Sequence, residues 1–251
     1  MSGVHTQDGY RIRFDWGPVG AVASASDVLV VVDVLSFTTT LSVAADRGVP
    51  VVPCRWRDER ATVLAREHRA TLAVPRSAAG PGEVSLSPGT VRAAAGLARL
   101  VLPSPNGSAI AAAARVPVLG VSLRNRTAAA ARIRTLLDAG RRITVVAAGE
   151  RWPDGTLRPA VEDLWGAGAL IAALPDDGRS PEAHAAAAAA GPVLADPAGM
   201  LHGCASGREL TAIGFGDDVD VAAELDAGTA VPVLEDGVFV PTAAAVPAAE
   251  G

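Results

Sequence analysis

The sequence predicts an α/β protein with three α/β/α layers around a mainly parallel sheet. The first observation is a unit of strand, polar loop and helix that recurs at least four times along the 251 residues. Such alternation favours a parallel sheet with helices on both faces, joined by right-handed crossovers. The second is the β-branched run 28–32, which is typical of a strand buried on both faces. The repetition is also compatible with two related halves.

The chain is long enough to bury the core of one large domain, and we expect a single domain over residues 1–251. Two lobes, about 1–90 and 91–251, are the alternative.

The first predicted elements lie before and after the run 28–32 in the sequence. Tyr10 to Trp16 alternates aromatic or apolar residues with polar ones, which predicts an edge strand. The strand 28–32 ends at Asp33, and a short helix over 41–46 is stopped by a following glycine and proline.

Similar units follow. A strand is expected at 49–53, a helix capped by Asp58 runs to about His68, and another strand covers 71–74. Residues 77–89 are rich in glycine and proline and predict a loop.

Three further strands, at 100–103, 116–121 and 143–147, each lead into a polar loop. Helices are expected after the first two loops, and another over about 159–174.

The C-terminal part has a different pattern. A helix is expected over 182–190, a loose segment over 191–207, and two short helices before residue 226. The pair Asp236-Gly237 lies between alternating apolar residues and predicts a C-terminal β-hairpin. We expect the tail after Pro241 to be disordered.

Composition excludes several function classes. The net charge of −5 argues against nucleic acid as a partner, and no apolar run could span a membrane. The polar N-terminus is no signal peptide, and two cysteines without metal or redox spacing favour a cytoplasmic location. The chain contains no lysine, which excludes a Walker A loop and Schiff-base chemistry.

Polar residues follow the strands at the edge where the carboxyl ends of parallel strands meet. Ligands bind at that edge in open α/β sheets. The only two asparagines of the chain lie in these loops. The residues expected to converge are Asp33, Ser36, Ser104, Asn106, Ser122, Asn125 and Glu150.

Thr38, Thr39 and Thr40 are poor helix-interior residues but suit a helix start. Their hydroxyls and the free N–H groups there would form a cradle for an anion, together with Asn106 and Ser108.

Carboxylates suggest a cation at the same edge. Pro159 suits a first helical turn, which places Glu162 and Asp163 near the helix start. Complementing the helix dipole is one explanation for these acids. If they lie near Asp33, however, they repel it unless a cation lies among them, and Mg²⁺ suits an all-oxygen site. No set of cysteine and histidine suits zinc.

Several segments resemble the 2-phosphosulfolactate phosphatase family, which comprises magnesium-dependent α/β phosphatases. Residues 33–40, DVLSFTTT, resemble its Asp-Val-Leu-Arg-Ala-Ser/Thr-Thr-Thr signature, and 104–108 resemble its Thr-Asn-Gly-Thr loop. Residues 147–150 and 161–168 are similar to its Ala-Gly strand end and Glu-Asp helix. Further likeness lies at Leu86-Ser87-Pro88 and in 207–232, so the resemblance spans about 28–240.

The resemblance implies hydrolysis of a 2-phosphosulfolactate-like monoester to sulfolactate and phosphate, with Mg²⁺ as cofactor. The expected partner is a small anionic phosphorylated substrate, and a homodimer is left open. Catalytic residues would be Asp33, Glu150 and Glu162, and metal ligands Asp33, Glu162 and Asp163. Substrate-binding residues would be Ser36, Thr38, Thr39, Arg76, Asn106, Gly107, Ser108 and Asn125.

Two positions depart from the family pattern. Ser36 replaces an arginine and Leu86 replaces an asparagine, both in motifs expected near the substrate. A hydroxyl cannot reproduce the bidentate grip of a guanidinium on an anion. Arg76 or Arg124 could supply the charge from another loop, and a different small phosphorylated acid is a second hypothesis for the substrate.

Two alternatives concern the chemistry. A non-catalytic small-anion-binding or sensor protein on the same scaffold is the competing class. Asp33 could serve as a metal ligand or as a nucleophile that forms an aspartyl-phosphate. The first role is favoured because Leu35, not an acid, lies two residues after it.

Overall fold

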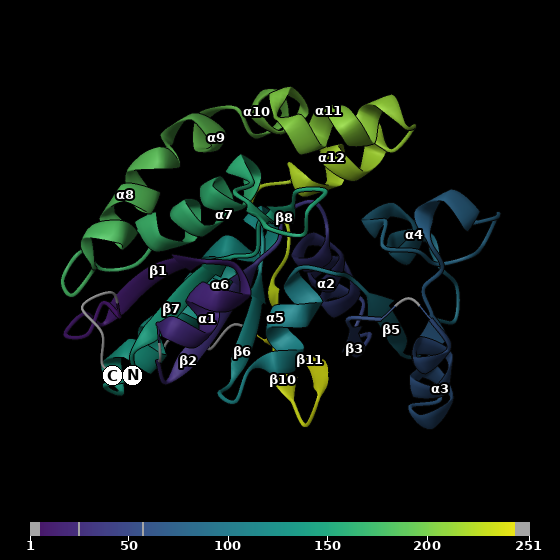
Figure 1. The fold of residues 1–251 in the computed structure, drawn as a ribbon, viewed down its shortest axis with the longest axis horizontal. Coiled ribbons are helices and arrows are strands. Elements are labelled where there is room, and N and C mark those ends of the chain that lie inside the picture. Colours follow the sequence, from purple (N-terminus) through teal and green to yellow (C-terminus); the bar gives the residue numbers. More distant parts are fainter. Residues whose placement is uncertain (1–5, 25, 57, 244–251) are drawn as a thin grey trace, which may run out of the picture.

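The computed structural model describes residues 6–24, 26–56 and 58–243, and in this part of the chain the main feature is a nine-stranded sheet. Its strand order is β1-β7-β2-β6-β10-β11-β3-β5-β4 (Figure 1). The strands are β1 (Ile12–Trp16), β2 (Val28–Val32), β3 (Val51–Cys54), β4 (Thr71–Leu72), β5 (Leu100–Pro103), β6 (Val118–Val121), β7 (Ile143–Ala147), β10 (Ala230–Glu235) and β11 (Val238–Ala243).

Most strand pairs are parallel, and the predicted α/β class and C-terminal hairpin are confirmed. The hairpin does not lie at an edge. β10 pairs antiparallel with β6, and β11 pairs antiparallel with β3. The hairpin therefore joins two groups of parallel strands into one sheet. Strands that precede residue 90 in the sequence and strands that follow it are interleaved in this sheet order.

Helices cover both faces of the sheet, as expected for three layers (Figure 1). On the face of α7 lie α6 and α8, and on the other face lie α1, α2 and α5. The helices are α1 (Gly17–Ala23), α2 (Phe37–Asp46), α3 (Glu59–Glu67), α4 (Pro88–Ala93), α5 (Gly107–Ala113), α6 (Arg126–Asp138), α7 (Val161–Ala172), α8 (Pro181–Ala189), α9 (Gly191–Ala195), α10 (Pro197–Gly203), α11 (Ala205–Ala212) and α12 (Gly216–Ala222).

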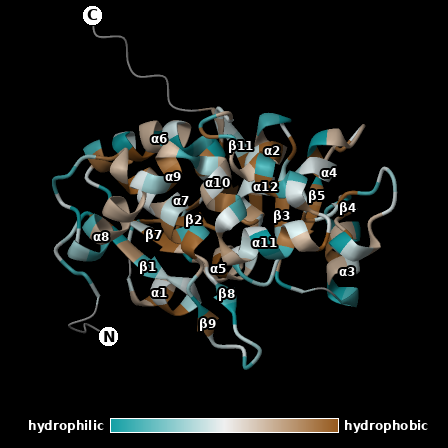
Figure 2. Ribbon diagram, turned by 90° about the horizontal axis from the view of Figure 1, so that it is seen from above, coloured by the Kyte–Doolittle hydropathy of each residue, from teal (hydrophilic) through white to brown (hydrophobic). Residues whose placement is uncertain are grey.

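The residues of β2 explain why it is central. All five are buried, and they alternate between the two faces. Leu29 and Val31 join the core beneath α5, whereas Val30 and Val32 join the core beneath α7. The brown central strands in Figure 2 show the same apolar layer. An apolar run without polar alternation is what burial on both faces requires.

Small residues allow α7 to lie close to its neighbours. A Cβ at Gly166 would come within 2.6 Å of a Val34 methyl carbon, and one at Gly168 within 2.0 Å of the Ala186 carbonyl oxygen. Gly166 therefore lets α7 pack closely against the end of β2, and Gly168 lets it pack closely against α8.

The structure corrects the expected elements in three places. Helix α1 follows the edge strand directly, and a small hairpin of β8 (Glu150–Arg151) and β9 (Leu157–Arg158) occupies the predicted loop before α7. Segment 191–207, expected to be loose, forms α9, α10 and the start of α11. Its glycine and proline residues lie at helix starts, where Asp196 caps α10 by accepting from Gly199 N–H.

One smaller expectation, on the C-terminal tail, also changes. Strand β11 continues past Pro241 to Ala243, and the rest of the predicted disordered tail, 244–251, lies outside the described residues, as do residues 1–5. Across the described ranges no helix is both long and apolar enough to cross a membrane.

Candidate active site

Asp33 lies at the carboxyl end of β2, as predicted, and its side chain is only 6% exposed. One carboxylate oxygen accepts from Phe37 N–H (3.2 Å) and the other from Gly107 N–H (2.8 Å). A Cβ at Gly107 would lie 2.7 Å from the Asp33 carboxylate, so only glycine permits this approach. Asp33 therefore joins the start of α2 to the start of α5.

Asp163 approaches the same region from the first turn of α7. It is buried, and its two carboxylate oxygens accept from Val34 N–H (2.7 Å) and Gly149 N–H (2.8 Å). Val34 follows Asp33, and Gly149 follows β7. Asp163 thus connects α7 to the ends of two adjacent strands, a role that neither helix-dipole complementation nor metal ligation requires.

Two glutamates complete the group. Glu150 begins β8 and accepts from the side-chain amide of Asn106 at 2.9 Å. Glu162 is buried at the first turn of α7 beside Cys204. Burial, and after it the Glu162 carboxylate, raises the pKa of the Cys204 thiol to about 11. The two glutamates thus come from two elements that flank Asp33.

The electrostatics show that these acids act on one another. Burial raises the pKa of Asp33 to about 7, with Glu150 and Glu162 adding to the effect against the N–H groups of Gly107 and Phe37. Burial and the charge of Asp33 also raise the pKa of Asp163 well above its ordinary value. Burial raises the pKa of Glu150, whereas the hydrogen bond from Asn106 and the charge of Arg158 lower it. We call Asp33, Glu150, Glu162 and Asp163 the carboxylate cluster.

The donor chemistry of the cluster fits Mg²⁺, because every donor is oxygen. However, among the described residues no three His, Cys, Asp or Glu side chains are arranged to hold one metal ion. The protein would therefore supply one or two direct ligands. That number is usual for Mg²⁺, which retains waters and takes further oxygens from a bound phosphate.

The predicted anion cradle differs from the observed arrangement. Thr38 Oγ1 donates to the Asp33 carbonyl at 2.8 Å, Thr39 Oγ1 to the Val34 carbonyl at 2.7 Å, and Thr40 Oγ1 to the Leu86 carbonyl at 2.7 Å. The first N–H of α2 is bound by Asp33 itself. These hydroxyls fix the turn after β2, and any direct contact with substrate stays a prediction.

The loop after β5 is also held internally. Ser108 Oγ donates to the carbonyls of Cys54 (2.8 Å) and Ser104, and Gly107 N–H donates to Asp33. Asn106 binds Glu150. The predicted substrate-binding residues of this loop therefore orient the carboxylate cluster.

Ser36 and Arg76 meet, although 40 residues separate them. Arg76 Nη2 donates to Ser36 Oγ at 2.6 Å, and Arg76 Nε donates to Asp218 at 3.0 Å. The Arg76 side chain is 17% exposed and lies over the ring of Phe215. The sequence suggested that Arg76 could replace the missing arginine, and the structure brings its guanidinium to Ser36.

Arg124 and Asn125 lie in η2 (Leu123–Asn125), after β6, and have other partners. Arg124 pairs with Asp46 (2.9 Å) and Glu224. The Asn125 side chain accepts from Ser122 N–H (2.9 Å) and donates to the carbonyls of Gly120 and Ala230. Asn125 is completely buried and its amide closes this turn, so a contact with substrate stays a prediction.

Sequence reasoning missed Arg158. It stands opposite Glu150 in the β8–β9 pair, and its charge opposes the rise in the pKa of that carboxyl. The pair Asp154-Gly155 between β8 and β9 is a turn signal that could have indicated the hairpin. Asp218 and Phe215, which contact Arg76, are far from it in sequence and gave no local signal.

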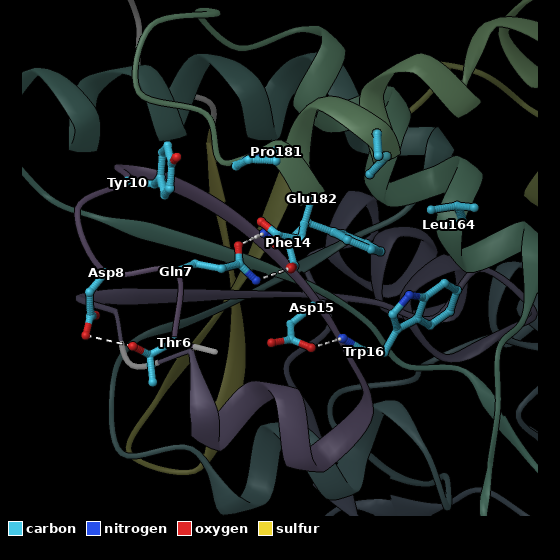
Figure 3. Close-up of a pocket in the computed structure, with 12 residues that line it drawn as sticks. Thr6, Gln7, Asp8, Tyr10, Phe14, Asp15, Trp16, Leu164, Pro181 and Glu182 are labelled. Carbon is cyan, nitrogen blue, oxygen red and sulfur yellow. Dashed lines mark hydrogen bonds between the residues drawn. The ribbon is translucent and has the colours of Figure 1, made fainter. Parts of the chain in front are cut away.

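A cavity of about 840 Å³ lies elsewhere, between β1 and α8 (Figure 3). Tyr10, Phe14, Trp16 and Glu182 are among the residues that line it. It contains no member of the carboxylate cluster, so its size does not make it the site of the chemistry.

Comparison with known families adds an independent observation. The model of the family described as 2-phosphosulpholactate phosphatase matches residues 20–237. The match begins before β2 and ends at the turn of the C-terminal hairpin. It therefore includes the whole carboxylate cluster and Arg76.

Proposed function

Because this chain belongs to the 2-phosphosulpholactate phosphatase family, we propose that it is a magnesium-dependent phosphoric monoester hydrolase. The substrate is the phosphate ester of a small 2-hydroxy acid, the class to which 2-phosphosulfolactate belongs. Water attacks the phosphorus, the phosphorus–oxygen bond to the acid breaks, and that oxygen is protonated. The products are the hydroxy acid and inorganic phosphate.

The observation that carries this proposal is the buried carboxylate cluster at the end of β2. The pKa values of Asp33, Asp163 and Glu150 are raised because these acids are buried and lie near other carboxylates. Such an arrangement is costly unless a cation or a proton compensates the charge. Perturbed carboxylates of this kind occur at sites of chemistry more often than elsewhere.

Asp33 and Glu162 are the proposed ligands of Mg²⁺, because Asp163 is committed to two backbone N–H groups. When bound, the ion offsets the charge of the phosphate and of the transition state. Glu150 is the proposed base for the attacking water, since burial raises its pKa above the ordinary value of a glutamate. Asn106 orients Glu150 through its amide.

The first test is hydrolysis of 2-phosphosulfolactate, followed by phosphate release, with Mg²⁺ and with EDTA. Turnover should require the metal and return when Mg²⁺ is restored. Asp33→Asn should lower turnover by about 10²-fold or more while circular dichroism stays native.

The matched control is Asp27→Asn, just before the other end of the same strand, where the carboxylate pairs with Arg142 near the surface. This variant should keep normal turnover. Full activity in EDTA, or near-normal turnover of a folded Asp33→Asn, would contradict the proposal. If Mg²⁺ binds that variant normally but turnover is lost, Asp33 acts as a nucleophile.

A non-catalytic anion-binding or sensor protein is the second candidate. It is favoured by the internal engagement of Thr38, Thr39 and Ser108, which resembles a finished structural turn more than an open catalytic one. Binding of phosphate or sulfolactate without any turnover in Mg²⁺ would support it.

A further inference from the structure

A second cavity, of about 1000 Å³, is lined by Arg76, the residue that donates to Ser36. It is enclosed by α3, the segment from β4 to η1 (Arg76–Ala78), and the link between α11 and α12. Its lining is largely apolar, and Ile213 at the link is 60% exposed. The residues that matter here are Leu72, Val74, Arg76, Leu86, Ile213 and Phe215.

The cavity adjoins the turn after β2 through Arg76. This residue lines the cavity and also donates to Ser36, in the turn that begins at Asp33. Leu86 lines the cavity too, and its carbonyl accepts from Thr40 of α2. Arg76 and Leu86 therefore belong both to the wall of the cavity and to the contacts that hold the turn after β2 and α2.

Arg76 gives the cavity one cationic end. In the described contacts it donates through Nε to Asp218 and through Nη2 to Ser36. A guanidinium has five N–H donors, so further donors are available to an anion. Asp218 also accepts from Ser87 Oγ, which holds the arginine and its partner in place.

The remainder of the cavity does not suit a second anion. Asp58 and Glu59, at the start of α3, line its other side. Asp58 is already paired with Arg60, and among the described residues that line the cavity Arg76 is the only cation, so this side offers a second anion no free positive charge. The volume also exceeds what a three-carbon acid fills, because pockets of roughly 300–1,000 Å³ hold ligands of drug size.

We propose that the substrate is the phosphate ester of a 2-hydroxy acid with an uncharged apolar substituent. The acid group binds Arg76, and the substituent enters the cavity between Leu72, Leu86 and Phe215. A short sulfonated side chain would leave the cavity largely empty and would meet no second cation among the described residues of its lining. The phosphate group of this substrate rests on the proposed phosphatase function. The binding of the acid group and of the apolar substituent is inferred from the residues that line the cavity.

Binding of the dephosphorylated acids tests the cavity without any turnover. Isothermal titration calorimetry of the full chain would compare 3-phenyllactate, lactate and sulfolactate. We expect 3-phenyllactate to bind at least about tenfold more tightly than either other acid, because the apolar substituent is buried. Equal or tighter binding of sulfolactate, or no binding of 3-phenyllactate, would overturn the inference.

Two variants test whether 3-phenyllactate binds in this cavity. Arg76→Gln should weaken 3-phenyllactate at least about tenfold, and Leu86→Asn should reduce the preference for 3-phenyllactate over lactate while leaving Arg76 in place. Arg66→Gln makes the same charge change on the exposed face of α3 and should have no effect. If Arg76→Gln unfolds, Leu86→Asn still decides: an unchanged preference would refute the cavity as the site.

Turnover separates this inference from the proposed function. The two substrates are 2-phospho-3-phenyllactate and 2-phosphosulfolactate, each with Mg²⁺. Preferred hydrolysis of the phenyl compound supports both ideas. Preferred hydrolysis of 2-phosphosulfolactate refutes the apolar substituent but keeps the phosphatase. Tight binding of 3-phenyllactate with no hydrolysis of either ester refutes the phosphatase and keeps the cavity assignment.

Discussion

Asp163 and Glu162 are adjacent buried acids of α7, yet the structure predicts that their alanine variants differ widely in stability. Asp163→Ala removes the acceptors of two backbone N–H groups, those of Val34 and Gly149. In the described contacts Glu162 accepts from no backbone N–H group. The pair therefore allows a comparison within one turn of one helix.

The expected change in the free energy of unfolding follows from the two backbone N–H groups that lose their acceptor. Each buried N–H without an acceptor costs about 1–3 kcal/mol, so Asp163→Ala should lower the free energy of unfolding by about 2–6 kcal/mol. Release of the repulsion from Asp33 reduces this loss, because the charge of Asp33 helps to raise the pKa of Asp163. Glu162→Ala should change the free energy of unfolding by less than about 1 kcal/mol, since it relieves repulsion and orphans no backbone group.

Urea unfolding at pH 7.5 in EDTA measures both variants without interference from bound metal. The midpoint should fall for Asp163→Ala at an unchanged slope, whereas the Glu162→Ala midpoint stays near that of the parent protein. Turnover at low temperature should be lost in folded Glu162→Ala. Equal midpoints for the two variants, or a larger loss for Glu162→Ala, would show that Asp163 does not hold the ends of β2 and β7.

Two further predictions concern single hydrogen bonds. Asn106→Ala should reduce turnover about tenfold. It should also move the acidic limb of the pH–rate profile to higher pH, because the Asn106 amide lowers the pKa of Glu150. An acidic limb that stays in place would mean that Asn106 does not orient the base. Glu224→Gln should flatten the fall of stability below about pH 4.5, the ordinary pKa of this carboxyl, measured by acid titration with circular dichroism. The hydrogen bond from Arg92 lowers the folded pKa of Glu224, so the stabilisation is present above the unfolded pKa and is lost as pH falls through the folded pKa; an unchanged acid transition would contradict this.

The position of Asp33 could be predicted from the sequence because two local facts determine it. A β-branched run that is buried on both faces defines a central strand, and parallel strands place their carboxyl ends at one edge. The same logic predicted that Asn106 and Glu150 come near this edge, and the structure joins them by a hydrogen bond. This reasoning therefore predicts which residues lie together when their loops lead from a strand into a helix in adjacent βα units.

The rule failed where partners come from distant segments. Antiparallel insertion of β10 and β11 between β6 and β3 depends on pairing across the whole chain, and a hairpin motif does not reveal its neighbours. The helices of 191–207 escaped because alanine, glycine and proline give no amphipathic period, even though Asp196 supplies a cap. Sequence alone likewise could not tell which hydroxyls face a ligand.

The backbone donors explain why so many predicted binding residues prove to be internal. Four N–H groups, from Val34, Phe37, Gly107 and Gly149, are bound by Asp33 and Asp163. Two buried acids thereby tie together β2, α2, α5, α7 and the end of β7. A site built in this way fixes its carboxylates before any ligand arrives, which is the preorganisation that electrostatic catalysis requires. It leaves substrate recognition to groups that are not used in that framework, and Arg76, held by Asp218 and Ser36 at the mouth of an apolar cavity, is the guanidinium that the structure brings to the turn after β2.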